Sequence, residues 1–122
     1  MADNYTQMTV SPCIPKRFVT EKEINLLHDE GLSHEELTEE SNKKYYFYCN
    51  EGCGENENIA EIFQAIIKRS KGKLKYVVLE GAFTCSKMRP GEFGGLACLI
   101  TKDKDEWFDT GSWLQRQIAK LK

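Results

Sequence analysis

The sequence predicts an α+β domain built on a mixed or mostly antiparallel sheet of about four strands with a long central β-hairpin. An amphipathic helix at 58–71 and a C-terminal helix pack on the sheet, and a short acidic helical pair precedes it. Two observations favour this class. Apolar residues recur at helical spacing in 58–71, whereas short aromatic or β-branched runs at 43–49, 74–80 and 95–101 are typical of strands. Glycine, proline and charged turns separate the later runs, which favours hairpins.

The length of 122 residues is typical of one compact domain with a core of its own. Pro12 and Pro15 interrupt any periodicity near the N-terminus, so residues 1–19 are expected to form an extended lead-in and residues 20–122 the domain. No apolar run approaches a membrane span, and no secretory signal pattern is seen. We therefore expect a cytoplasmic protein, with no membrane contact and with reduced cysteines.

Residues 20–41 are predicted to form two short helices. Thr20 and Glu23 have the spacing of a capping box, in which the hydroxyl and the carboxylate each accept a backbone N–H. Gly31 suits the left-handed position that follows a helix. Ser33 opens a second box with the same spacing, so an acidic helix is expected after it.

The next two elements are predicted from their apolar patterns. Residues 43–49 carry aromatic rings on both faces, so this strand is expected to be covered on both sides. The helix at 58–71 is expected to start at an Asn58 cap and to stop at Gly72. Its core-facing stripe consists of Ile59, Ile62, Phe63, Ile66 and Ile67.

The strands at 74–80 and 95–101 are expected to pair as one long hairpin. Pro90 and Gly91 suit the centre of a type II turn, which would place Met88 opposite Phe93. The same register places Cys85 opposite Leu96 and Phe83 opposite Cys98. Gly94 and Gly95 could form a bulge in this hairpin.

The chain is expected to end with a short strand and a docked helix. Residues 106–110 follow a charged turn and should pair with the strand at 95–101. The final segment has one apolar face, which we expect to pack on the sheet. That face consists of Trp113, Leu114, Gln117, Ile118 and Leu121.

Cys85 is the candidate nucleophile. In a strand its side chain would share a face with Lys87, and a nearby cation favours the thiolate. The alternative is a buried structural cysteine, which is the more frequent case. No phosphate-binding glycine motif occurs around it.

A metal site is a second chemical candidate. Cys49 and Cys53 are separated by three residues, a spacing that structural zinc sites use. No second close pair completes the ligand set, so no cofactor is expected. His28 and His34 are expected to be exposed helical residues rather than acid–base groups.

The charge distribution offers two kinds of partner. Residues 1–62 hold thirteen acidic and five basic side chains, whereas residues 63–122 hold six acidic and twelve basic ones. The basic half could bind nucleic acid. Its candidate residues are Lys68, Arg69, Lys71, Lys73 and Lys75. The acidic pair at 20–41 excludes a DNA-reading helix-turn-helix, because phosphates would repel it.

The leading functional hypothesis is a protein–protein interaction module, of the inhibitor or accessory type that phages and mobile elements encode. It depends on the polar hairpin tip and on the acidic segment. The candidate partner-binding residues are Lys87, Met88, Arg89, Glu92 and Phe93 at the tip, and Glu35, Glu36, Glu39 and Glu40 in the acidic segment. Nucleic-acid binding by the basic half and a small enzyme with a reactive Cys85 are the alternatives, and an enzyme is the less favoured class.

Overall fold

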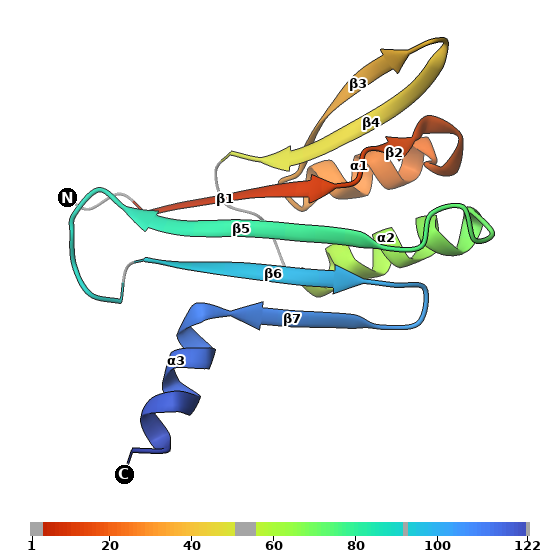
Figure 1. Ribbon diagram of the computed structural model, residues 1–122. Helices are drawn as coiled ribbons and strands as arrows, with labels where there is room; N and C mark the ends of the chain where they lie inside the picture. Colours follow the sequence, from red (N-terminus) through yellow and green to blue (C-terminus); the bar gives the residue numbers. More distant parts are fainter. Residues whose placement is uncertain (1–3, 51–55, 92, 122) are drawn as a thin grey trace.

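A computed structural model describes residues 4–50, 56–91 and 93–121 of the chain. The α+β class is confirmed, with three helices and a seven-stranded antiparallel sheet in place of about four strands (Figure 1). In chain order the elements are β1 (Asn4–Ser11), β2 (Ile14–Pro15), a 3₁₀ turn η1 (Lys16–Phe18), α1 (Glu21–Asp29), β3 (Ser33–Glu39), β4 (Asn42–Cys49), α2 (Asn56–Arg69), β5 (Val77–Cys85), β6 (Gly94–Ile100), β7 (Asp105–Asp109) and α3 (Thr110–Ala119).

The N-terminal segment forms the centre of the sheet. β1 pairs with β5 along its whole length and with the end of β4 on its other edge. β2 continues along the same edge of β4, while β3 occupies the opposite edge. The spatial order across the sheet is therefore β3, β4, β1, β5, β6 and β7. β2 lies on the same edge of β4 as β1. Residues 4–11 therefore form a central strand of the sheet, because they pair with a neighbour on each side.

The second acidic helix predicted after Gly31 is wrong. Residues 33–39 form β3, which pairs with β4 in an antiparallel hairpin from Ser33 opposite Tyr48 to Glu39 opposite Asn42. Glu40 and Ser41 form the connection, and both have positive φ. Two left-handed residues are the signature of a two-residue hairpin turn. The aromatic partner strand supplies the cross-strand contacts that an isolated acidic helix would lack.

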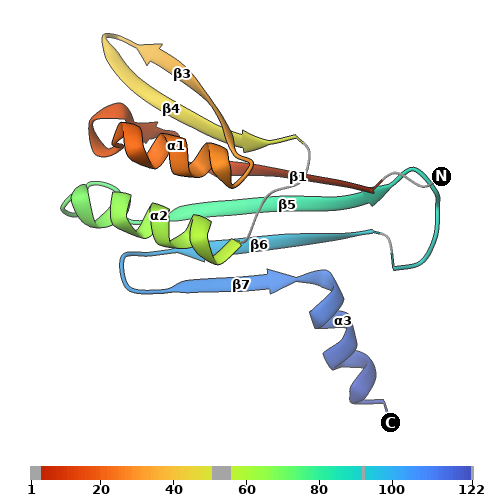
Figure 2. The same cartoon turned by 180° about the vertical axis from the view of Figure 1, so that it is seen from behind.

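Helices α1 and α2 cover the same face of the sheet (Figure 2). α1 begins with the predicted capping box at Thr20 and ends before Gly31, whose φ is +95°. α2 begins at Asn56, so the Asn58 cap is wrong. Asn58 instead donates a 3.2 Å hydrogen bond to Glu30, the C-cap residue of α1.

The core lies between these helices and the sheet. From α2 it contains four of the five predicted stripe residues, Ile59, Phe63, Ile66 and Ile67, while Ile62 is partly buried against it. From the strands it takes alternate residues of β1, β4, β5 and β6. Burying one such side chain contributes about 1.5–3 kcal/mol, so this layer is the main source of stability. Its buried strand residues include Met8, Val10, Phe47, Leu79, Cys98 and Ile100.

The hairpin of β5 and β6 exists, but its register differs from the prediction. Leu79 lies opposite Cys98, and Phe83 lies opposite Gly94. The pairs of Met88 with Phe93 and Cys85 with Leu96 are therefore wrong, and the ladder runs through Gly94 and Gly95 without a bulge. Residues 86–91 and 93 are outside the ladder, so they do not continue the hairpin. Gly91 has a φ of +84°, as expected for the second residue of a type II turn.

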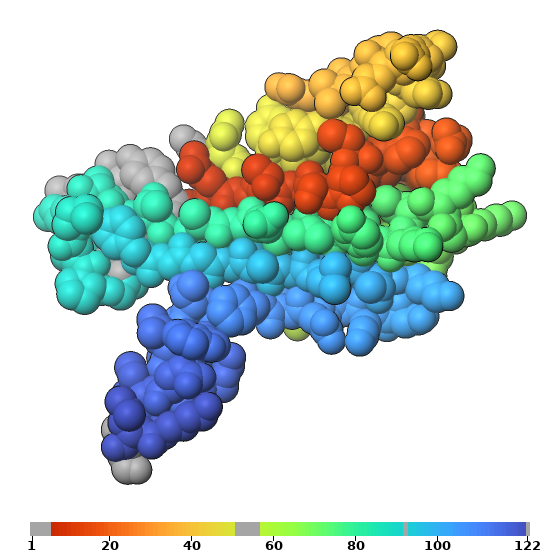
Figure 3. Space-filling view, in the orientation of Figure 1, coloured from red at the N-terminus to blue at the C-terminus, as the bar shows by residue number. Residues whose placement is uncertain are grey.

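The other face of the sheet carries no helix. Figure 3 views this face, on which the colours of the strands lie side by side. On β4, Tyr46 and Tyr48 are partly exposed on this face. The expectation that β4 is covered on both sides is therefore wrong. Tyr45 and Phe47 are buried under the helices, whereas their neighbours stay at the surface.

Candidate interaction surface

The first turn of α3 is fixed firmly to the sheet. The N–H of Ser112 donates a 2.7 Å hydrogen bond to Oδ1 of Asp109, and its hydroxyl donates to Oδ2 at 3.0 Å. These two bonds lower the pKa of Asp109 below its usual range. The N–H of Gly95 donates to Oγ1 of Thr110 at 3.1 Å. Asp109 therefore ends β7 and caps α3 at once, with no linker between strand and helix.

Beyond that turn, α3 points away from the body (Figures 1 and 3). None of its residues is buried, and Leu121 just after it is 86% exposed. The prediction of a docked helix is therefore wrong. α3 starts directly after β7, and its axis leaves the sheet at this junction (Figure 1). The exposed apolar side chains of this segment are Trp113, Leu114, Ile118 and Leu121.

β7 extends the exposed apolar area. It is an edge strand, and all five of its residues are exposed. Trp107 lies opposite Cys98, so its ring is on the helix-covered face, yet α1 and α2 leave it 37% exposed. Phe108 is exposed on the opposite face. β7 and α3 together with Leu121, named here the C-terminal surface, supply half of the large exposed apolar side chains among the described residues.

The predicted hairpin tip lies next to this surface. Phe93 and Gly91 line a hollow of about 330 Å³ together with Asp109, Thr110 and Gly111. Met88 is 87% exposed, and Lys87, Arg89 and Phe93 are also at the surface. Glu92 lies outside the described residues. Partner binding by the tip stays a prediction, and its loop borders the first turn of α3.

The acidic candidates do not form one helical face. They lie on β3 and its turn, where alternation sends Glu35 to the open face of the sheet and Glu36 to the other. Glu36 pairs with Lys16 at 3.2 Å, which raises the pKa of that lysine, and Glu39 pairs with Lys44 at 3.8 Å. Glu40 occupies the turn. Their role in partner binding also stays a prediction.

The thiol candidates differ in their surroundings. Cys85 is buried at the end of β5, and its sulfur accepts the N–H of Lys87 at 3.4 Å. Burial raises the pKa of Cys98 to about 12. Cys13 is partly exposed. No histidine or carboxylate contact at Cys85 is seen within the described part of the chain, so the geometry adds nothing to the nucleophile hypothesis.

Of the proposed metal-binding cysteines, the structure describes Cys49 but not Cys53. Cys49 is disulfide-bonded, so the expectation of reduced thiols is wrong for this residue, and Cys53 lies outside the described residues. A disulfide sulfur is not available as a thiolate ligand. Within 4–50, 56–91 and 93–121, no group of three or more metal-ligating side chains comes together.

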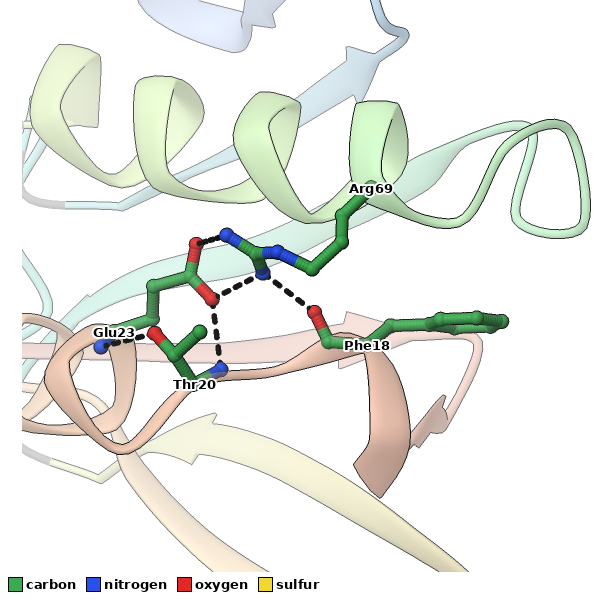
Figure 4. Close-up of polar contacts among 4 residues, drawn as sticks. All are labelled: Phe18, Thr20, Glu23 and Arg69. Atoms are coloured by element: carbon green, nitrogen blue, oxygen red, sulfur yellow. Dashed lines mark hydrogen bonds and ion pairs between the residues drawn. The ribbon is translucent and has the colours of Figure 1, made fainter.

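The basic run divides into two parts. Arg69 turns inward and binds Glu23 and the carbonyl of Phe18, so it is not available as a phosphate ligand (Figure 4). Lys68, Lys71 and Lys75 instead line a hollow of about 590 Å³. Lys102, from the turn between β6 and β7, lines it too. This fourth cation comes from far along the chain, and the sequence run alone does not show it.

The two histidines form a pair that the sequence analysis missed. Nε2 of His28 and Nδ1 of His34 lie 2.7 Å apart, and the rings stack with centroids 4.8 Å apart. Burial and the nearby His28 lower the pKa of His34 below its usual value. The two rings meet because residues 33–39 form a strand beside α1. The predicted second helix does not place them together, so the sequence analysis did not predict this pair.

The open sheet face is also hollowed. A concavity of about 680 Å³ is lined by Tyr46 and Tyr48, whose rings stack with centroids 5.5 Å apart, and by Gln7, Glu35 and Glu80. Polar and aromatic side chains alternate here with the buried ones. This face is therefore a second, more polar surface.

No family model, curated protein or solved structure matches this chain. None of the helices among the described residues is long and apolar enough to cross a membrane. The arrangement of the chain's own residues therefore carries the functional argument.

Proposed function

We propose that this protein is a protein–protein interaction module that binds its partner through the C-terminal surface. The observation that carries the proposal is α3, which has an apolar stripe and buries none of it. A helix of about ten residues is only marginally stable in water without tertiary packing. The stripe of α3 is therefore suited to a binding partner, in the way amphipathic helices fill apolar grooves.

Site-specific photo-crosslinking tests this function. A photoreactive phenylalanine analogue replaces Leu114 on the stripe, and in a matched chain it replaces Gln115 on the other side of α3. In cells of the source organism, we expect a protein adduct at Leu114 and little or none at Gln115. No adduct at Leu114, or equal adducts at both positions, would overturn the proposal.

The cluster of lysines supports a second candidate function. Lys68, Lys71 and Lys75 meet Lys102 around one hollow, and none of the four forms an ion pair with another described residue. Such a cluster attracts the phosphates of nucleic acid. Binding to a short generic RNA or DNA should weaken steeply with salt and weaken further in Lys102→Glu. A flat titration at low salt would exclude this function.

The cytoplasm remains part of the proposal as the location. Disulfides persist mainly in oxidising compartments, so the state of Cys49 in the cell is informative. Rapid alkylation of intact cells, followed by mass spectrometry, should find Cys49 modified if the compartment is reducing. A fully protected Cys49 would speak for an oxidising compartment.

A further inference from the structure

We infer that the partner of the C-terminal surface is a second copy of this chain, with α3 of each copy lying on β7 of the other. This inference rests on the proposed function and names its partner. It follows from three features of the described residues: the junction at Asp109, the uncovered Trp107, and the distribution of charge between α3 and β7.

The junction at Asp109 directs α3 away from its own sheet. Asp109 is both the last residue of β7 and the N-cap of α3, and its two bonds to Ser112 hold the first turn in place. The bond from Gly95 to Thr110 fixes that turn against β6. In this arrangement the stripe of α3 is uncovered within one chain, and a second molecule is the partner that would bury it.

The sheet has an uncovered position that fits a helix. α1 and α2 cover the helix-bearing face of the inner strands, and Figure 2 shows no helix over β7 on that side. Trp107 lies on this face and remains partly exposed. A helix packed there would bury its ring and extend the existing helical layer by one member.

The charges of the two elements are complementary. Residues 110–121 contain Arg116 and Lys120 and no carboxylate, whereas β7 contains Asp105, Glu106 and Asp109. Asp105 and Asp109 are on the same face as Trp107 because strand residues alternate. Within the chain Asp105 accepts the Nε1–H of Trp107 and Asp109 accepts from Ser112, so the partner's cations would meet carboxylates that keep their negative charge. On α3 the two cations are one turn apart, beside the stripe at Trp113. A second copy thus brings an apolar stripe flanked by cations to an aromatic ring flanked by carboxylates.

Strand-to-strand pairing of two copies is disfavoured. If β7 paired antiparallel with itself over its full length, Asp105 of one copy would lie opposite Asp109 of the other. Like charges directly opposite each other destabilise a sheet, and charged edge strands resist such pairing. The contact is therefore helix to sheet. Because each copy supplies both elements, a two-fold arrangement closes as a dimer.

Sedimentation equilibrium of the purified full chain tests the inference. Between about 1 and 100 μM, we expect a reversible monomer–dimer equilibrium in the absence of any other protein. Ile118→Glu should weaken dimerisation by about tenfold or more, because the carboxylate would be buried without a partner. Gln115→Glu makes the same charge change on the other side of α3 and should leave it nearly unchanged.

A charge exchange identifies the contact itself. Asp105→Lys and Arg116→Asp should each weaken the dimer, and the double variant should restore much of the loss, because the opposite charges then meet across the two copies. Absence of rescue overturns the inferred contact. Circular dichroism checks that each variant keeps the folded body, which α3 does not help to bury.

The two proposals fail in different ways. A chain that stays monomeric at all concentrations overturns the second copy as partner. If a Leu114 adduct of some other mass still forms in cells, the interaction module stands without the dimer. If the chain is monomeric and no adduct forms at Leu114, both proposals are wrong.

Discussion

Arg69 in the last turn of α2 binds the carboxylate of Glu23 in α1 through both of its terminal nitrogens. Nη1 lies 2.6 Å from Oε1 and Nη2 lies 3.0 Å from Oε2 (Figure 4). Oε1 also accepts the N–H of Thr20 at 2.9 Å, and Nη1 donates to the carbonyl of Phe18 at 2.6 Å. One carboxylate thus closes the capping box of α1 and joins α1 to α2.

Removing this cation should destabilise the body. Arg69→Leu leaves Glu23, which is only 7% exposed, without its charged donor. We expect the free energy of unfolding to fall by about 2 kcal/mol. This is less than for a fully buried ion pair, because the guanidinium is partly exposed to water. Urea unfolding measures it. Lys68→Leu, next in sequence and exposed, is the matched control; equal effects of the two changes would contradict a specific role for Arg69.

The same carboxylate predicts a pH dependence. Burial raises the pKa of Glu23, but hydrogen bonds from Arg69 and Thr20 outweigh it and leave the pKa below its ordinary value of 4.5. Glu23 therefore contributes stability above about pH 4.5, and the contribution disappears as the pH falls through the lower folded-state pKa. The stability difference between wild type and Glu23→Gln should shrink in acid. A difference that is independent of pH would contradict this assignment.

The free thiols should differ in reactivity. Burial raises the pKa of Cys98 to about 12, so iodoacetamide should modify it only through unfolding. Cys85 is buried as well, whereas Cys13 is partly exposed and should react first. Peptide mapping of the native protein over time measures the order. If Cys85 reacted first, the reactive-thiol hypothesis would regain support.

His34 should take up its proton at a lower pH than an ordinary histidine. Burial and the neighbouring His28 lower the pKa of His34 below 6.5. The folded state then binds this proton less readily than the unfolded state, so the contribution of His34 to stability is present above about pH 6.5 and is lost as the pH falls through the lower folded-state pKa. In an NMR titration, His28→Ala should raise the pKa of His34. An unchanged or lower value would remove His28 as a cause.

Gly94 should be needed for the placement of α3. A Cβ at this position would lie 2.7 Å from Oγ1 of Thr110, the atom that receives the N–H of Gly95. Gly94→Ala should therefore displace the first turn of α3 and lower the free energy of unfolding by about 1–3 kcal/mol. Gly95→Ala is the milder control, since its nearest contact would be 3.4 Å. Chemical shifts of residues 110–112 should move in the first variant and not in the second.

Local signals in the sequence predicted the elements that depend on local contacts. The capping box at Thr20 and the stripe of α2 each lie within a few residues of chain, so both could be predicted. β3 was missed because it begins with the same capping-box spacing as a helix. Its turn at Glu40 and Ser41 also lacks the Asn-Gly or Asp-Gly pair that usually marks such a hairpin.

Alternation alone could not fix the register of β5 and β6. The predicted pairing placed Phe83 opposite Cys98, whereas the structure places it opposite Gly94. The shift is four residues, an even number, so every side chain keeps its face of the sheet. Burial is the same in both registers, and only the loop conformation separates them.

The interaction surface could be predicted only in part. The apolar stripe of α3 is visible in the sequence, but a stripe has the same pattern whether it packs on its own sheet or on another molecule. The direction of α3 depends on the missing linker at Asp109, which requires the end of β7 to be known. The histidine pair and the contribution of Lys102 to the lysine hollow depend likewise on tertiary contacts.

The central position of β1 has a consequence for the order of synthesis on the ribosome. Met8 is made early, but its neighbours across the sheet are Cys49 on one side and Gly81 on the other. The nascent N-terminal segment therefore stays without its main partner strand until β5 has left the exit tunnel. Assembly of the sheet centre is then a late, long-range step, and ribosome-bound chains that stop before residue 77 cannot complete it.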